Sequence, residues 1–293
     1  MSDISDLPEV LIEPVVRRAL DEDLGSGGDL TSRAVISPDA TTRAHVVARE
    51  EGVLAGVQPA ALAFRLVDPT LELRFEVAEG ASVEAGEVVA TVEGRTRSIL
   101  TAERTALNFL GHLSGVATAT GTLVAAVAGT DARICGTRKT TPGLRSLEKQ
   151  AVRAGGGVNH RFGLGDAILI KDNHLAASGG VAAAVGAARR QSGPATAIEV
   201  EVDNLGQLEE ALEAGATALL LDNMAPPDLR RAVKITGGRA LLEASGRITA
   251  EMVRAIAETG VNYISSGWIT HSAPVLDFGL DFVSDTSSIP SRD

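Results

Sequence analysis

The sequence has 293 residues, of which 44% are hydrophobic but only 3% are aromatic, so Ala, Val, Leu and Gly must build most of the core. This composition favours packed α/β layers over a β-sandwich, and the net charge of −11 argues against nucleic acid as the main partner. The single cysteine, Cys135, excludes an intrachain disulfide and is typical of a reducing compartment. The acidic N-terminus lacks the apolar segment of a secretory signal, and no unbroken apolar run reaches about 18 residues. We therefore expect a cytoplasmic protein without a membrane partner.

The first 130 residues predict a mixed α/β region. Apolar residues recur at helical spacing over 7–24, which predicts an amphipathic helix. Short runs bounded by glycine turns predict strands at Ala44–Ala48, Leu71–Val77 and Val88–Val92. Helical patterning returns over 98–128.

After residue 130 the pattern becomes regular, because short apolar runs are often followed by Ala-rich helical stretches. A spacing of roughly 20 to 30 residues between runs is typical of βα units that feed a parallel sheet. Six consecutive units favour a barrel over an open sheet, and a closed barrel would need eight. The six predicted strands are Ala132–Cys135, Ala167–Ile170, Ala197–Val202, Ala218–Leu221, Ala240–Ala244 and Tyr263–Ser265.

Polar or charged residues follow every one of these six runs. In a parallel barrel all the strand C-termini meet at one mouth, so we expect these residues to converge there. The alternative is that single members are helix caps, with Asp222 and Ser245 the best candidates. The residues are Gly136-Thr137-Arg138-Lys139, Lys171-Asp172-Asn173-His174, Glu201 with Asp203, Asp222-Asn223, Ser245-Gly246-Arg247 and Ser266-Gly267-Trp268.

Charge in this region indicates an anionic ligand. Residues 133–171 hold eight Lys and Arg against two acidic residues, inside a chain that is acidic elsewhere. Such an island suits a small polyanion, although a solvated basic face is the alternative. The two Ser-Gly strand ends offer unhindered backbone N–H groups for phosphate. Glu201 and Asp222 could bind ribose hydroxyls, hold Mg²⁺ through water or stabilise a cationic sugar.

Several motifs together resemble one enzyme family over nearly the whole chain. They are Gly136–Arg145 with Glu148-Lys149, Gly155–Gly157, Asn159–Leu164, Leu169–His174, Ile198–Val202, Leu221–Met224, Glu243–Gly246, Ile264–Gly267 and, nearer the N-terminus, Glu22-Asp23, Gly28–Thr31 and Glu103–Asn108. This set closely resembles quinolinate phosphoribosyltransferase. Trp268 departs from the family pattern, which has a smaller residue there.

The resemblance implies a fold and an assembly. It implies an N-terminal α/β sandwich domain over residues 1–112 and an incomplete parallel α/β barrel over 113–274, with the tail 275–293 packed back on the first domain. It also implies a homodimer with shared active sites, or a higher oligomer, in which Arg104 enters the partner's site.

The resemblance also assigns roles to residues. Thr137, Arg138, Lys139, His160, Arg161 and Lys171, with Arg104, would bind carboxylates and phosphates, and Lys139 and Lys171 would be catalytic together with Glu201 and Asp222. Glu201 and Asp222 would face the ribose and Mg²⁺, and would hold the metal through water. The phosphate contacts would come from Ser245, Gly246, Arg247, Ser266, Gly267, Trp268 and His271.

The implied reaction transfers phosphoribosyl from phosphoribosyl pyrophosphate to quinolinate, with loss of CO₂, to give nicotinate mononucleotide for NAD biosynthesis. Three alternatives stay open at this point. Lys171 on a barrel strand could be the amine of a Schiff-base aldolase, a related phosphoribosyltransferase could act on another base, and a non-catalytic barrel could sense sugar phosphates.

Overall fold

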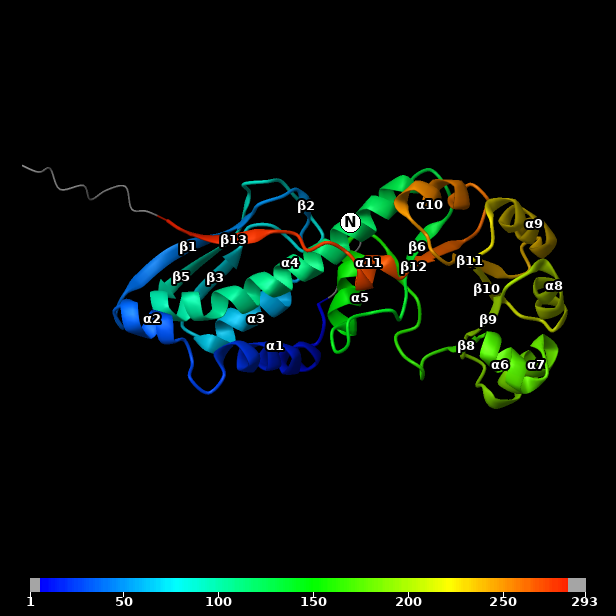
Figure 1. Ribbon diagram of the computed structural model, residues 1–293, viewed down its shortest axis with the longest axis horizontal. Coiled ribbons are helices and arrows are strands. Elements are labelled where there is room, and N and C mark those ends of the chain that lie inside the picture. The colour runs from blue at the N-terminus through cyan, green and yellow to red at the C-terminus, as the bar shows by residue number, and fades with distance from the viewer. Residues whose placement is uncertain (1–5, 284–293) are drawn as a thin grey trace, which may run out of the picture. The chain divides into compact units, whose positions relative to one another are not determined.

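The computed structural model describes residues 6–283, which divide into two compact units (Figure 1). The first unit holds the described residues up to Thr118, the segment Ser146–Ala154 and the described residues from Ala273. The second unit holds Ala119–Arg145 and Gly155–Ser272.

The first unit is built on an antiparallel sheet with the strand order β13-β1-β5-β3, beside a small sheet formed by β2 and β4. Two helices that the sequence did not indicate, α2 and α3, add to the predicted α1 and α4. The elements of this unit are α1 (Glu9–Leu24), α2 (Leu30–Val35), β1 (Thr41–Ala48), β2 (Gly52–Val53), α3 (Val57–Val67), β3 (Glu72–Phe75), β4 (Ser82–Val83), β5 (Val88–Arg95), α4 (Thr96–Ala126, which continues into the second unit), α5 (Arg145–Ala154) and β13 (Phe278–Phe282).

Periodic burial explains why these segments form helices. On α1, Ile12, Val16 and Leu20 recur every four residues and are buried, and α1 packs against α3. Helix α4 is long and apolar enough to cross a membrane by length and composition, but 61% of its most apolar window is buried within the protein. A helix buried in this way has the character of a core helix.

The segment 146–154, which the sequence placed in the barrel, groups with the first unit. Its side chains explain this placement. The fully buried Glu148 lies 2.8 Å from the Nε2 of His112 on α4, and Gln150 donates to the side chain of Gln58 at 3.1 Å. The chain leaves the second unit for this one helix and then returns to it. Local sequence patterns do not indicate such an exchange between units.

The second unit is an open, curled half-barrel of seven parallel strands in the order β7-β6-β12-β11-β10-β9-β8. The predicted incomplete parallel barrel is therefore confirmed, as is the α/β class. Its elements are β6 (Arg133–Gly136), β7 (Val158–Asn159), β8 (Ile168–Ile170), α6 (Asp172–Ser178), α7 (Val181–Gln191), β9 (Ile198–Val202), α8 (Leu205–Glu213), β10 (Ala218–Asp222), α9 (Pro226–Thr236), β11 (Leu241–Ser245), α10 (Ala250–Ala257), β12 (Tyr263–Ser266) and α11 (Trp268–His271).

All six predicted strands are present to within about a residue at each end. The seventh, β7, contains only Val158 and Asn159, so no apolar run could reveal it. It pairs with β6 through Cys135 and Gly136.

The C-terminal segment of the described chain returns to the first unit. Strand β13 pairs antiparallel with β1, from Ala48 opposite Phe278 to Ala44 opposite Phe282. Residues 284–293 of the predicted tail lie outside the described residues.

Two glycines on α4 allow this segment to lie against the helix. Gly111 and Gly115 are one helical turn apart and so share a face. A Cβ on Gly111 would lie 2.8 Å from the carbonyl oxygen of Leu276, and a Cβ on Gly115 would overlap the carbonyl of Pro274. The backbone N–H of Leu276 donates to the Gly111 carbonyl at 3.0 Å.

We predict that Gly115→Ala destabilises the protein by about 1–3 kcal/mol or more, because backbone rather than a flexible side chain occupies the space. Gly27→Ala is the matched control, because a Cβ there meets no atom within 4 Å and no left-handed backbone is required. Urea unfolding of both variants measures the difference. Equal stabilities would show that the C-terminal segment does not depend on this contact.

Candidate active site

Strand geometry in the second unit decides which side chains face the inside of the half-barrel. Successive side chains on a strand point to opposite faces. On β9, Val200 and Val202 are fully buried, whereas Glu199 and Glu201 alternate with them and face the other way. On β11 the same alternation separates Leu242 and Ala244 from Glu243 and Ser245.

Glu199 lines a second hollow together with His160, Arg161 and Glu243. Glu201, Glu243 and Ser245 line a cavity of about 560 Å³ at the C-terminal ends of the strands. It has the size of a small-molecule site. It gathers eleven of the sixteen predicted site residues, together with Leu169, Leu220, Asn223, Glu243 and Ser265. The eleven are Thr137, Arg138, Lys139, His160, Arg161, Lys171, Glu201, Asp222, Ser245, Gly246 and Arg247.

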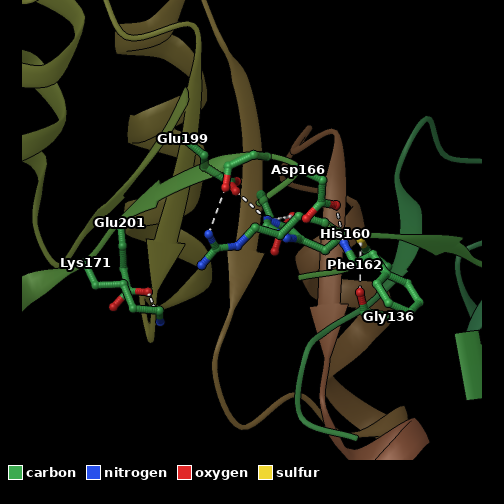
Figure 2. Close-up of polar contacts among 11 residues, drawn as sticks. Gly136, His160, Phe162, Asp166, Lys171, Glu199 and Glu201 are labelled. Carbon is green, nitrogen blue, oxygen red and sulfur yellow. Dashed lines mark hydrogen bonds and ion pairs between the residues drawn. The ribbon is translucent and has the colours of Figure 1, made fainter. Parts of the chain in front are cut away.

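Cations from the ends of three strands line this cavity. Arg138 and Lys139 follow β6, His160 and Arg161 follow β7, and Lys171 follows β8. The backbone N–H of His160 donates to the carbonyl of Gly136 at 3.0 Å, which ties the ends of β7 and β6 together (Figure 2).

Burial makes this clustering of cations costly. The pKa of Arg161 is lowered, first by burial and then by the neighbouring charge of Arg138. The Nε atoms of Arg138 and Arg161 are buried and have no hydrogen-bond partner among the described residues. Cations held together away from water need anions, so the cavity is suited to an anionic ligand.

Lys171 and Glu201 form an ion pair in the cavity, with the Nζ of Lys171 2.7 Å from the Oε2 of Glu201 (Figure 2). The Lys171 side chain is 46% exposed and that of Glu201 only 11%. A pair with one solvated partner is weak, so a ligand that offers either residue a better partner can replace it.

A second pair lies deeper. The Nε2 of His160 is 2.5 Å from the Oε2 of Glu199, and the Oε2 of Glu243 is 4.0 Å from the same nitrogen. The hydrogen bond that His160 donates to Glu199 raises the pKa of His160, against the opposing effect of burial. Burial, followed by the charge of Glu199, raises the pKa of Glu243 to about 7.

His160, Glu199 and Glu243 also place three possible metal-ligand atoms within 4.8 Å of one another. Yet Glu199 already forms a hydrogen bond with the imidazole Nε2 of His160. The positive charge of Arg161 is also close enough to lower the pKa of His160. The chemistry of the group therefore fits a charged imidazole held by carboxylates better than a metal site.

The carboxylates of Glu201 and Asp222 are the groups that could bind Mg²⁺. Both line the cavity, and hard oxygen donors are what Mg²⁺ prefers. Asp222 is not a helix cap, because α9 begins after Ala225. Ser245 is not one either, because α10 begins after Thr249. The capping alternative is thus excluded for both residues.

The two predicted phosphate segments differ. Ser245, Gly246 and Arg247 line the cavity, and Gly246 has a φ of +141°. The helix that follows starts only at Ala250, so the expected direct step from Ser-Gly into a helix does not occur there.

The second segment, Ser266-Gly267-Trp268, is not part of the cavity lining, although Gly267 lies beside the side chain of Lys139. Ser266 is buried, Trp268 is 43% exposed, and helix α11 has four residues, too few for a strong dipole. A Cβ on Gly267 would lie 2.8 Å from the Cδ of Lys139 and 3.2 Å from the Cδ2 of His271. Gly267 therefore permits the close approach of both side chains.

Arg104 is an exposed residue of α4 in the first unit, whereas every residue that lines the cavity belongs to the second unit. Its predicted role in a partner's site stays a prediction.

Sequence reasoning expected Asn223 at the mouth of the barrel without a role of its own, and it did not single out Glu199, Glu243 or Ser265 as site residues. The two-residue alternation of a strand could have revealed two of these residues. Glu199 lies two residues before Glu201, and Glu243 lies two residues before Ser245, so each shares a strand face with a predicted site residue. An acidic residue inside an otherwise apolar strand is the accompanying signal.

Comparison with known proteins agrees with this geometry. Residues 29–114 match the family described as "Quinolinate phosphoribosyl transferase, N-terminal domain", and residues 116–281 match its "C-terminal domain". The chain is 44% identical over 268 residues to the "Probable nicotinate-nucleotide pyrophosphorylase [carboxylating]" of Bacillus subtilis (strain 168), with 92% of each chain covered. It is 46% identical over 271 residues to the "Nicotinate-nucleotide pyrophosphorylase [carboxylating]" of Mycobacterium leprae (strain TN), with 91% of this chain and 95% of that one covered.

A solved structure shows the same architecture. The nicotinate-nucleotide pyrophosphorylase from Francisella tularensis superposes with a TM-score of 0.92 at 39% identity, with 97% of this chain and 100% of that chain covered. The two family matches together span most of the sequence and include every strand of the half-barrel. This chain belongs to the quinolinate phosphoribosyltransferase family.

Proposed function

We propose that this protein transfers the phosphoribosyl group of phosphoribosyl pyrophosphate to the ring nitrogen of quinolinate, with loss of CO₂, to give nicotinate mononucleotide. The observation that carries the proposal is the make-up of one cavity. Five side chains that are or can be cationic, from three successive strand ends, lie in the same space as the carboxylates of Glu201 and Asp222. Such a cavity can hold a dianion beside a sugar that becomes cationic.

Quinolinate has two adjacent carboxylates, and a dianion bound away from water needs several fixed cations. Arg138 and Arg161 supply planar guanidiniums, and His160 supplies an imidazole whose raised pKa favours the charged form. The base would therefore lie on the side of the cavity formed by the ends of β6 and β7.

The sugar and its phosphates would occupy the other side. As the glycosidic bond breaks, positive charge develops on the ribose ring, and carboxylates fixed nearby stabilise it. Glu201 and Asp222, which line the cavity, would take this role. Mg²⁺ held by the same carboxylates, directly or through water, would neutralise the departing pyrophosphate.

Lys171 and Lys139 complete this part of the cavity. Phosphate oxygens can replace Glu201 as the ion-pair partner of Lys171. The Glu201 carboxylate would then be available to bind the ribose or the metal. Lys139 and the segment from Ser245 to Arg247 would contact the remaining phosphate oxygens.

Decarboxylation requires no organic cofactor in this scheme. Once the ring nitrogen is ribosylated, the bond from C2 to its carboxylate can break with loss of CO₂, because the adjacent positive nitrogen stabilises the electron pair left on C2. A proton from water then adds at C2 to give nicotinate mononucleotide. The protein contributes placement and electrostatics. We further propose that the enzyme is cytoplasmic and acts as a homodimer or higher oligomer, in which Arg104 completes the site of a partner subunit.

The cluster of arginines counts against a Schiff-base aldolase. Such an enzyme uses a lysine amine to attack a carbonyl, whereas the neighbouring guanidiniums of Arg138 and Arg161 suit an anion. A related phosphoribosyltransferase with another base, or a non-catalytic sensor, would share the cavity, so the substrate test decides between them and the proposal.

The function predicts a strict choice of base. Incubated with phosphoribosyl pyrophosphate and Mg²⁺, the protein should convert quinolinate to nicotinate mononucleotide and CO₂ but should not use nicotinate. With only one carboxylate, nicotinate would leave buried cations unpaired, at a cost of several kcal/mol. Chromatography of the nucleotide and release of labelled CO₂ measure both reactions. Comparable turnover of nicotinate, or no turnover of either base, would contradict the proposal.

Removal of either carboxylate should slow the chemical step. We expect Glu201→Gln and Asp222→Asn each to lower kcat by about 10²-fold or more, with a smaller effect on quinolinate affinity. Steady-state kinetics and calorimetric titration with quinolinate separate the two effects. A normal kcat in both variants would show that neither carboxylate stabilises the transition state.

Arg104 gives a test of the shared site. Arg104→Ala should lower kcat/KM by about 30-fold to several thousand-fold, equivalent to roughly 2–5 kcal/mol, if its guanidinium binds a carboxylate. A solvated ion pair would be worth less than about 1 kcal/mol.

Mixing Arg104→Ala with Lys171→Ala shows whether Arg104 acts across subunits. A mixed dimer would then have one intact site, so random exchange should restore up to about a quarter of wild-type activity per total site. If Arg104 acts within its own chain, every site keeps one lesion and no activity returns. A tagged subunit verifies that exchange has occurred.

A further inference from the structure

Asn223 follows the last residue of β10 and has a left-handed backbone conformation. Its φ is +52°, and among the described residues it is the sole non-glycine residue with a positive φ. L-residues avoid this region, and Asn is one of the few that visit it. Strain of this kind persists where the surroundings impose it, often at functional sites.

Three contacts impose it here. The backbone N–H of Asn223 donates to the carbonyl of Ser245 at 2.9 Å, which joins the ends of β10 and β11. The side-chain Nδ2 donates to the Oδ2 of Asp222 at 2.6 Å. On its other side the carboxamide lies over Gly246, where a Cβ would be 2.6 Å from the Oδ1 of Asn223 and 3.3 Å from its Cα.

The carboxamide thus fills the space between a carboxylate and a glycine, both of which line the cavity. Its amide group fixes one oxygen of Asp222 and so sets the direction of the carboxylate plane. Its bulk accounts for the glycine at 246, because any side chain there would collide with it. The left-handed backbone of Asn223 is what turns the carboxamide back toward Asp222.

We propose that Asn223 is a positioning residue for the reaction, which aims the Asp222 carboxylate at the ribose or metal and fixes the backbone of Gly246 beside the phosphates. This inference rests on the function proposed for Asp222. Asn223 touches neither substrate in the proposal and acts through its two neighbours. A purely structural role would instead require that its loss lower stability and leave the chemistry of Asp222 unchanged.

Asn223→Gly separates these two roles because it changes activity and stability in opposite directions. Glycine adopts a φ of +52° without strain but has no carboxamide. We expect an unchanged or higher Tm together with a 10- to 100-fold lower kcat/KM for phosphoribosyl pyrophosphate, on the order expected when a hydrogen bond to a charged group is lost. Calorimetric titration should show quinolinate bound as in the wild type.

Asn223→Asp is the second variant, and it keeps the shape and the tolerance of a left-handed backbone. It replaces the donor by an oxygen that faces Asp222, so activity should fall at least as far as in Asn223→Gly. This variant also keeps the test decisive if the glycine variant fails to fold. Full activity in Asn223→Asp would overturn the proposal.

A double-mutant cycle with Asp222→Asn tests whether Asn223 acts through Asp222. In the Asp222→Asn background, Asn223→Gly should cost less than about threefold, because coupled residues are not additive. An equal loss in both backgrounds would overturn the proposal. If Asp222→Asn alone has normal activity, the role proposed for Asp222 is wrong. If Asp222→Asn has low activity but Asn223→Gly has normal activity, only the inference about Asn223 is wrong.

Asn204→Gly serves as the matched control. Asn204 also follows a strand of the half-barrel, and its side chain accepts a hydrogen bond from the backbone N–H of Gln207 at 3.0 Å, as the N-cap of α8. Its loss should lower Tm slightly and leave kcat/KM unchanged, because glycine is itself a tolerated N-cap. If Asn204→Gly lowers kcat/KM as much as Asn223→Gly, loss of an asparagine amide has a general effect and the proposal is overturned.

Discussion

Mutual repulsion of cations is the interaction on which the arrangement of the catalytic unit depends. Arg138, Arg161 and the imidazole of His160 are held close enough for each to affect the charge of another. Left mobile, such side chains would move apart into water. Short connections to β6 and β7, and the hydrogen bond between the His160 N–H and the Gly136 carbonyl, prevent this. The scaffold therefore maintains a positive field that a dianion can neutralise.

The same repulsion explains why carboxylates line a site meant for anions. Without Glu199 and Glu243, the charge of His160 would be opposed both by burial and by Arg161. Glu199 is in direct hydrogen-bond contact with the imidazole, and Glu243, with its pKa raised to about 7, can adjust its charge to the surroundings. Carboxylates are thus distributed among the cations, with Glu199 and Glu243 beside His160 and Glu201 beside Lys171.

Much of this architecture was accessible from sequence, because it is expressed in local patterns. Apolar runs that end in polar residues predicted six parallel strands and the convergence of residues as far apart as Thr137 and Arg247. What depends on tertiary contact was not accessible. The two residues of β7 carry too little pattern, and α5 joins the first unit through buried contacts of Glu148 and Gln150 that no local pattern encodes. Motif reading also favoured residues at strand ends over Glu199 and Glu243, which lie within strands.

The two ion pairs of the cavity differ in exposure, and this difference assigns them different functions. In the pair of His160 and Glu199 the side chains are 15% and 13% exposed, so separating the partners would leave a charge poorly solvated. In the pair of Lys171 and Glu201 the lysine is 46% exposed, so water can solvate the ammonium once the carboxylate leaves it. The deep pair is consequently suited to fix geometry through the whole reaction. The shallow pair is suited to exchange partners when a phosphorylated sugar enters, because water solvates the released lysine and the sugar gives both members of the pair new contacts.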